Sequence, residues 1–511
     1  MTGNAAHWFV DRHLAEGRGA KTAFEEAWEG GRQLTYGALA KGAGQVADAL
    51  TRCGILREAR AAMFVLDQIE FPLIFWGELK AGVVPVALNT LLSTEVYGAI
   101  LRDSRAAIAF VSQELWDIVG PAAQASPHLR QIVVIGPEAP EGTLSWEAFM
   151  AGTTPAETLD CSGDEIAFWL YSSGSTGAPK GVRHVHSALR QTCDTFARQV
   201  LDIQENDKVF SAAKLFFAYG LGNGMSFPLS VGASSLLFNG RPTPDSVSHI
   251  LETYQPTVYY GVPTLFAALL HKWETDGAPP QVPLRCCTSA GEALPADIGR
   301  KWLDLMGIDI IDGVGSTEML HIFLSNRPGD VHYGTSGTAV PGYEVRLVDE
   351  AGAEVETGVI GELLVRGGSA AADYWNQRSK TRQTFEGEWT RTGDKYERTA
   401  AGRYIYCGRT DDMFKVSGIW VSPFEIEQAL VAFPAVLEAA VVAHRDEDDL
   451  EKPKAFVVLK PGHGPEAVAG MRTFIKDKIG KWKYPRWIEI IDDLPKTATG
   501  KIQRFKLRGR S

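Results

Sequence analysis

The sequence predicts an α/β protein, in which a large N-terminal domain of parallel-sheet subdomains with helices plus an antiparallel subdomain precedes a small α+β C-terminal domain. Strand-like and helix-like runs alternate through residues 34–111 and again through 208–270, and the strand-like runs are apolar. Such alternation is typical of parallel sheets covered on both faces. After Gly334 the runs become short and are separated by Gly, Asp and Pro, which indicates antiparallel strands. At 511 residues the chain also exceeds what one core supports.

The N-terminal elements follow from the spacing of apolar residues. Residues 34–50 have apolar positions at helical spacing, and Ser93 is placed to be the N-cap of a later helix. The expected order is helix 34–50, strand 61–66, helix 71–81, strand 83–88, helix 93–102 and strand 107–111. The pattern returns as strand 208–211, strand 234–238, helix 246–254, strand 257–260 and a helix that begins at Pro263.

The C-terminal elements are shorter. The antiparallel runs are 343–348, 361–365 and 404–407, followed by helix 423–432, strands 436–443 and 455–459, helix 467–479 and strand 487–491. We place the N-terminal domain at residues 1–408 and the C-terminal domain at 412–511, with the boundary at 409–411.

Composition excludes several classes of protein. The net charge of −11 argues against a general nucleic-acid binder, which must neutralise phosphates. The six cysteines form no CxxC pair, which fits a reducing cytoplasm. No apolar signal segment precedes Phe24, and the apolar stretch 71–88 is interrupted by Glu78 and Lys80. We therefore expect a cytoplasmic protein with no nucleic-acid or membrane partner.

The most informative segment is a loop that follows the apolar run 166–171. It reads Ser-Ser-Gly-Ser-Thr-Gly-Ala-Pro-Lys-Gly over residues 172–181, with hydroxyls, glycines and one lysine that suit the oxygens of a polyphosphate. It is not a Walker A loop, because Pro179 stands where a glycine must precede the lysine. The sequence therefore predicts a phosphate-binding loop of another kind.

With four further motifs, this loop resembles the adenylate-forming superfamily, which includes acyl-CoA synthetases, luciferases and peptide-synthetase adenylation domains. The motifs follow the family's order along nearly the whole chain. They are Gly315-Ser-Thr-Glu318, Thr392-Gly-Asp394, the hinge motif Gly408-Arg-Thr-Asp411 and the lysine motif Pro495-Lys-Thr-Ala-Thr-Gly-Lys501.

The resemblance implies a reaction in two steps that uses ATP, Mg²⁺ and coenzyme A. A carboxylate is a poor electrophile, so its oxygen first attacks the α-phosphorus of ATP with release of pyrophosphate, and a thiol then displaces AMP. Positive charge must offset the repulsion between the carboxylate and the polyphosphate, and Lys501 is the candidate that bridges them. The C-terminal domain is implied to be mobile and to reorient at Asp411 between the steps.

The resemblance also assigns individual residues. Thr317 and Glu318 join Lys501 as catalytic residues, and Glu318 and Thr176 are the metal ligands, since Mg²⁺ prefers hard oxygen donors. Cofactor contacts are assigned to Ser172, Ser173, Gly174, Ser175, Thr176, Gly177, Lys180, Gly291, Glu292, Asp312, Gly313, Asp394, Arg409, Lys415, Ser417 and Gly418. Val314 departs from the family pattern, because an aromatic residue that stacks on adenine is common there.

The predicted acid pocket combines aromatic walls with small residues. Such a pocket suits a flat ring better than acetate or a long chain. Its residues are Phe217, Ala218, Tyr219, Gly220, Ala290, Gly315, His321 and Ile322. In these details the chain is most similar to benzoate-CoA ligases and their hydroxybenzoate relatives, so the expected substrate is benzoate or a simple substituted benzoate.

Three alternatives remain open from the sequence. They are an acyl-CoA ligase for a medium-chain or other acid, an adenylation enzyme that loads a carrier protein, and a nucleotide-binding regulatory protein without turnover. The resemblance further implies a partner, a lysine acyltransferase that silences Lys501, and we also expect a second copy of the chain in a homodimer.

Overall fold

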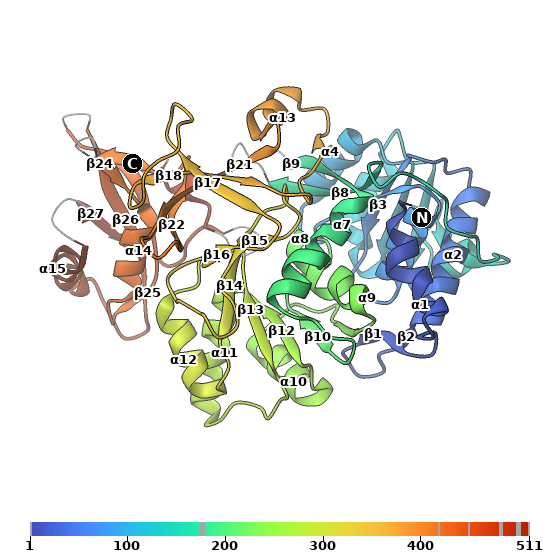
Figure 1. Ribbon diagram of the computed structural model, residues 1–511, viewed down its shortest axis with the longest axis horizontal. Helices are drawn as coiled ribbons and strands as arrows, with labels where there is room; N and C mark the ends of the chain where they lie inside the picture. The colour runs from blue at the N-terminus through green and yellow to red at the C-terminus, as the bar shows by residue number, and fades with distance from the viewer. Residues whose placement is uncertain are drawn as a thin grey trace. The chain divides into compact units, whose positions relative to one another are not determined.

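The computed structural model describes residues 3–173, 179–416, 419–447, 450–479, 484–496 and 502–508 (Figure 1). Contacts between residues divide the chain into two compact units. The large unit comprises Met1–Glu344 and Val365–Thr390, and the small unit comprises Val345–Leu364 and Arg391–Ser511. This division concerns packing and not movement, so the hinge at 409–411 stays a prediction.

The first sheet of the large unit has nine strands, in the order β16-β15-β14-β13-β12-β10-β11-β1-β2. The six strands from β14 to β1 pair in parallel, and β2, β15 and β16 are antiparallel. The bounds are β1 Thr22–Glu26, β2 Gln33–Thr35, β10 Lys208–Ser211, β11 Ser234–Leu237, β12 Val258–Gly261, β13 Cys286–Ser289, β14 Ile310–Gly315, β15 Ile322–Ser325 and β16 Thr338–Ala339.

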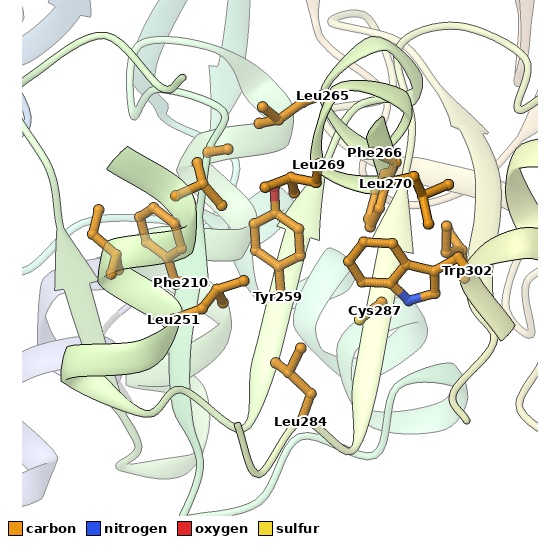
Figure 2. Packing of buried hydrophobic residues seen from close by; sticks show 14 of the residues in the cluster. Phe210, Leu251, Tyr259, Leu265, Phe266, Leu269, Leu270, Leu284, Cys287 and Trp302 are labelled. Carbon is orange, nitrogen blue, oxygen red and sulfur yellow. The ribbon is translucent and has the colours of Figure 1, made fainter. Parts of the chain in front are cut away.

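Three helices pack on this sheet: α10 (Pro244–Tyr254), α11 (Pro263–Asp276) and α12 (Ala296–Met306). Figure 2 shows the core between them, where Tyr259 of β12 faces the helices and Trp302 of α12 lies beside Phe266 of α11. The rings of Phe266 and Trp302 meet edge to face with centroids 4.7 Å apart, a favoured geometry for aromatic pairs.

The second sheet of the large unit has eight strands, in the order β19-β9-β8-β4-β3-β5-β6-β7. Its strands are β3 Arg60–Phe64, β4 Val84–Ala87, β5 Ile108–Ser112, β6 Gln131–Ile135, β7 Leu144–Ser145, β8 Ile166–Ser173, β9 Pro179–Val185 and β19 Asp373–Tyr374. The expected helices are present as α2 (Tyr36–Arg52), α3 (Glu70–Lys80) and α4 (Thr94–Ser104). Ser93 is the N-cap of α4, but its side chain makes no capping hydrogen bond. The predicted α/β class is confirmed.

The antiparallel subdomain is a five-stranded sheet in the order β17-β18-β21-β20, with β22 paired to β21. Its strands are β17 Glu344–Val348, β18 Ile360–Arg366, β20 Phe385–Glu386, β21 Trp389–Arg398 and β22 Tyr404–Arg409. The end of the small unit is a sheet of β25 (Val436–Arg445), β26 (Glu451–Leu459) and β27 (Trp487–Ile490). Helices α14 (Pro423–Val431) and α15 (Ala467–Ile479) pack on it. In the described part of the chain, no helix is both long and apolar enough to cross a bilayer.

A buried histidine ties the N-terminal segment to the second sheet. His186, the first residue of α7 (His186–Thr192), accepts a hydrogen bond at Nδ1 from the backbone N–H of Ala5, 3.2 Å away. Burial lowers the pKa of His186 to about 4, and the neighbouring charges of Glu165 and Arg57 do not restore it. The imidazole is therefore neutral in the folded protein at pH 5, where the unfolded chain binds a proton.

We expect this histidine to make stability depend on pH. The unfolded state takes up a proton below about pH 6.5 and the folded state only near pH 4, so acid destabilises the wild type through this site. His186→Asn removes that linkage. Urea unfolding of both proteins at pH 7.5 and pH 5.0 measures it: the stability advantage of the wild type should shrink by about 2 kcal/mol at pH 5.0. A difference that is the same at both values would contradict the expectation.

Candidate active site

The candidate acid site lies where the strand order of the first sheet reverses. From β12 the chain continues to β13 and β14 on one side, whereas from β10 it continues to β11 on the other. Ligands of open α/β sheets bind in the crevice outside the carboxyl ends of the strands at such a point. Helix α8 (Ala218–Leu221) follows β10 and brings Tyr219 to this edge.

Tyr219 is fixed there by its hydroxyl. The hydroxyl donates to the carbonyl oxygen of Thr288 in β13, 3.1 Å away, and lies 3.4 Å from that of Gly261 at the end of β12. Burial raises the pKa of Tyr219 well above its usual value, so the phenol remains a donor. The ring is thus held rigidly at the sheet edge.

His321 packs between aromatic rings beside Tyr219. Its ring centroid lies 5.5 Å from that of Tyr219 and 4.4 Å from that of Phe227. Burial lowers the pKa of His321 to about 3, so the ring is neutral and contributes no fixed charge. Its Nε2 lies 3.1 Å from Oδ1 of the buried Asn223. A Cβ on Gly222 would collide with the imidazole, so this packing requires glycine.

The other predicted pocket residues lie on the same segments. Ala218, Ala290 and Ile322 are buried. Phe217 stacks obliquely against Phe216, with centroids 4.4 Å apart. Added Cβ atoms at Gly220 and Gly315 would meet the backbone carbonyls of Lys214 and His321, so both glycines permit close approach of two chain segments.

A second cluster joins the two sheets of the large unit. Lys180 of β9 places its Nζ 3.2 Å from Oε1 of Glu318, which follows β14. The hydroxyl of Tyr374 in β19 donates to the same Oε1 at 2.7 Å and accepts from Nζ of Lys180 at 3.1 Å. The backbone carbonyls of Thr317 and Glu318 accept from Nε2 of His184 and from the N–H of Ala371. These contacts fix the Glu318 carboxylate in place.

The electrostatics of this cluster favour an ionised carboxylate. Burial alone would raise the pKa of Glu318, but the Lys180 ammonium and the Tyr374 hydroxyl outweigh it, and the pKa lies below its usual value. The described residues contain no group of three or more His, Cys, Asp and Glu side chains that could hold a metal. Mg²⁺ commonly binds one or two carboxylates together with substrate phosphates, so Glu318 fits such an ion when nucleotide is present.

The remaining predicted nucleotide contacts of the large unit lie just after β13 and within β14. Gly291 adopts a positive φ of 96°, and Glu292 beside it is exposed. Asp312 is buried, and burial raises its pKa well above the usual value. Gly313 and Val314 pair with Ser325 and Leu324 of β15.

In the small unit, Asp394 and Arg409 lie opposite each other on β21 and β22. Nη1 of Arg409 donates to Oδ1 of Asp394 at 2.9 Å and to the carbonyl oxygen of Thr392 at 3.0 Å. The structure therefore brings together two of the side chains predicted to contact the cofactor. Asp411 is exposed, and its carbonyl oxygen accepts from Arg508 at 2.8 Å.

Several predicted site residues lie outside the described part of the chain. They are Gly174, Ser175, Thr176, Gly177, Ser417, Gly418 and Lys501, together with the side chains of Ser173 and Lys415. The described neighbours of Lys501 are well anchored: Lys496 and Ile502 form an antiparallel bridge, and Arg504 donates to Glu427 at 2.7 and 3.0 Å.

Sequence reasoning missed Tyr374 and Asn223. Tyr374 lies far along the chain from Lys180 and Glu318 and belongs to none of the five motifs. Asn223 stands between Gly222 and Gly224, and this Gly-Asn-Gly was the signal for a tightly packed polar residue.

Known proteins match nearly the whole chain. The chain is 54% identical to a benzoate–CoA ligase of Thauera aromatica, over 99% of this chain and 95% of that protein. It is 53% identical to a 4-hydroxybenzoate–CoA/benzoate–CoA ligase of Rhodopseudomonas palustris, over 99% and 94%. A solved benzoate CoA ligase from Burkholderia xenovorans superposes with a TM-score of 0.89 at 47% identity, covering 99% of both chains.

A second solved structure, an anthranilate CoA ligase in complex with anthranoyl-AMP, superposes with a TM-score of 0.94 at 42% identity and covers 99% of this chain and 97% of that one. Residues 425–501 match the C-terminal domain of AMP-binding enzymes. Residues 11–375, which contain both the aromatic site and the Lys180–Glu318 cluster, match the AMP-binding enzyme family, and the chain belongs to that family.

Proposed function

We propose that this protein is an AMP-forming ligase that activates an aromatic carboxylic acid, benzoate or a simple substituted benzoate, and transfers it to coenzyme A. Identity of 53–54% over nearly the full length to ligases named for benzoate carries the proposal. The uncharged wall of Tyr219, His321 and Phe227 supports a flat aromatic substrate.

In the first step an oxygen of the acid attacks the α-phosphorus of ATP, and pyrophosphate leaves. This step brings two anions together, so positive charge near the phosphates lowers its barrier. Lys180 supplies one such charge, and Glu318 would hold Mg²⁺, which when bound offsets the charge of the phosphate oxygens. We assign Lys501 to the contact between the acid and the α-phosphate.

In the second step the thiol sulfur of coenzyme A attacks the acyl carbon, its proton is lost to solvent or a base, and AMP leaves. We propose that the small unit reorients between the steps at Asp411, and that Ser417 and Gly418 pass the pantetheine arm. Acylation of Lys501 by a partner enzyme, a homodimer and the cytoplasmic location also stay predictions.

The test of this function is the choice of acid. Benzoate should be used with a higher kcat/KM than hexanoate, because a flat site leaves the methylenes of a flexible chain unburied, and each loses roughly 0.8 kcal/mol of transfer free energy. Coenzyme A-dependent AMP release with benzoate, hydroxybenzoates, aminobenzoates and hexanoate measures it. A preference for hexanoate would favour the alternative ligase, and pyrophosphate release without thioester would favour an enzyme that loads a carrier protein.

Tyr219 should decide which rings are accepted. Tyr219→Ala removes the wall, so kcat/KM for benzoate should fall by about 10- to 200-fold while para-substituted rings are accepted better. Tyr219→Phe is the matched control, because it keeps the ring and loses only the hydrogen bonds to Thr288 and Gly261. The assay compares benzoate with 4-substituted benzoates. An unchanged profile in Tyr219→Ala would remove this residue from the pocket.

Lys501 should serve adenylation rather than thioester formation. Lys501→Ala should slow adenylate formation by about 10²- to 10³-fold, because it loses a contact made in that transition state. Coenzyme A-dependent turnover of presynthesised benzoyl-adenylate should be largely retained. Lys496→Ala is the control, since this lysine is tied to Glu438 at 2.7 Å. Equal losses in both half-reactions of Lys501→Ala would show that the assigned role is wrong.

A further inference from the structure

Tyr374 is the common partner of the two charged residues in the Lys180–Glu318 cluster. Its backbone is fixed in β19, where Tyr374 pairs with Val182 of β9, and its side chain is buried against Phe385 with ring centroids 5.3 Å apart. The hydroxyl donates to Oε1 of Glu318 at 2.7 Å and accepts from Nζ of Lys180 at 3.1 Å. Nζ also lies 4.3 Å from the centre of the phenol ring.

Both side-chain hydrogen bonds to the Glu318 carboxylate converge on one oxygen. Tyr374 and Lys180 both donate to Oε1, whereas among the described residues no side chain donates to Oε2; the remaining hydrogen bond to the carboxylate comes from the backbone of Glu318 itself. The carboxylate is therefore oriented through Oε1, and Oε2 is left available to a cation. Mutation of a partner that orients a metal ligand typically costs about 10- to 100-fold in metal affinity.

The chemistry of the two donors differs. A cation that binds Glu318 repels the Lys180 ammonium, so cation binding weakens the contact between this lysine and the carboxylate. The Tyr374 hydroxyl is neutral, so it can keep its hydrogen bond to Oε1 when the cation arrives. Its ring face and oxygen meanwhile offer the displaced ammonium a nearby position from which to contact phosphate.

We propose that Tyr374 is a positioning residue that orients Glu318 toward Mg²⁺ shared with the nucleotide and keeps Lys180 within reach of the phosphates. This inference rests on the proposed function only in taking nucleotide-bound Mg²⁺ as the cation. It concerns the metal and not the acid, so it can be tested without any acid.

The test compares Tyr374→Phe, which loses the hydroxyl and keeps the ring, with Tyr97→Phe. Tyr97 is a matched control because it is also buried, donates its hydroxyl to the carbonyl of Asn89 at 2.8 Å and belongs to α4. Glu318→Gln serves as the variant that loses the metal ligand. Binding of Mn²⁺, a spectroscopic substitute for Mg²⁺, is titrated by electron paramagnetic resonance with saturating ATP and no acid.

Mn²⁺ should bind the ATP complex of Tyr374→Phe about 10- to 100-fold more weakly than that of the wild type. Benzoate-dependent pyrophosphate exchange should fall at limiting Mg²⁺ and recover as Mg²⁺ is raised, whereas turnover of presynthesised benzoyl-adenylate should not change. Tyr97→Phe should lower the Tm without altering Mn²⁺ affinity.

Two results would overturn the inference. One is a Tyr374→Phe protein that loses thermal stability as Tyr97→Phe does but keeps wild-type Mn²⁺ affinity, which is the behaviour of a purely structural residue. The other is unchanged Mn²⁺ affinity in Glu318→Gln. The proposed substrate can fail separately. If Tyr374→Phe weakens Mn²⁺ binding but the wild type does not activate benzoate, the proposed substrate is refuted and this inference still holds.

Discussion

The ion pair between Lys180 and Glu318 is the interaction on which the arrangement of the large unit's site depends. Lys180 belongs to the eight-stranded sheet, and Glu318 follows a strand of the nine-stranded sheet, so the pair spans the junction between the two. The hydrogen bond from Nε2 of His184 to the Thr317 carbonyl, 2.9 Å long, crosses the same junction. The two residues that we propose for the phosphates and the metal, Lys180 and Glu318, thus come from two different sheets of the large unit.

Within the large unit, the aromatic residues around Tyr219 and the charged residues Lys180 and Glu318 form two different clusters. At the sheet edge that carries Tyr219, burial lowers the pKa of His321 to about 3, so its ring is neutral near pH 7, and burial raises the pKa of Asp312. Ionised groups are concentrated at Lys180 and Glu318 instead. Under the proposed function, the aromatic ring would lie beside uncharged side chains such as His321, while the charged cluster would be left for the polyanionic co-substrate.

Much of the fold could be predicted from periodicity. The helices expected at 34–50 and 71–81 are α2 and α3, since their apolar faces pack locally. Sheet order could not be predicted, because pairing between distant strands, such as β9 with β19, leaves no local signal. For the same reason the motifs pointed to Lys180 and Glu318 but not to Tyr374, which meets them only through that pairing. Asn223 was missed because its importance comes from contact with His321.

The close contact between Gly222 and the His321 ring has a consequence for changing the acid that the protein accepts. In a mutant library that randomises the whole segment after β10, most variants would fail to pack the core around His321, because any side chain at position 222 must displace the imidazole. Diversity is better confined to Tyr219 and Phe217, whose side chains can shrink without moving a neighbour's backbone. In related proteins whose acid specificity changes during evolution, Gly222 should be among the last positions to be substituted.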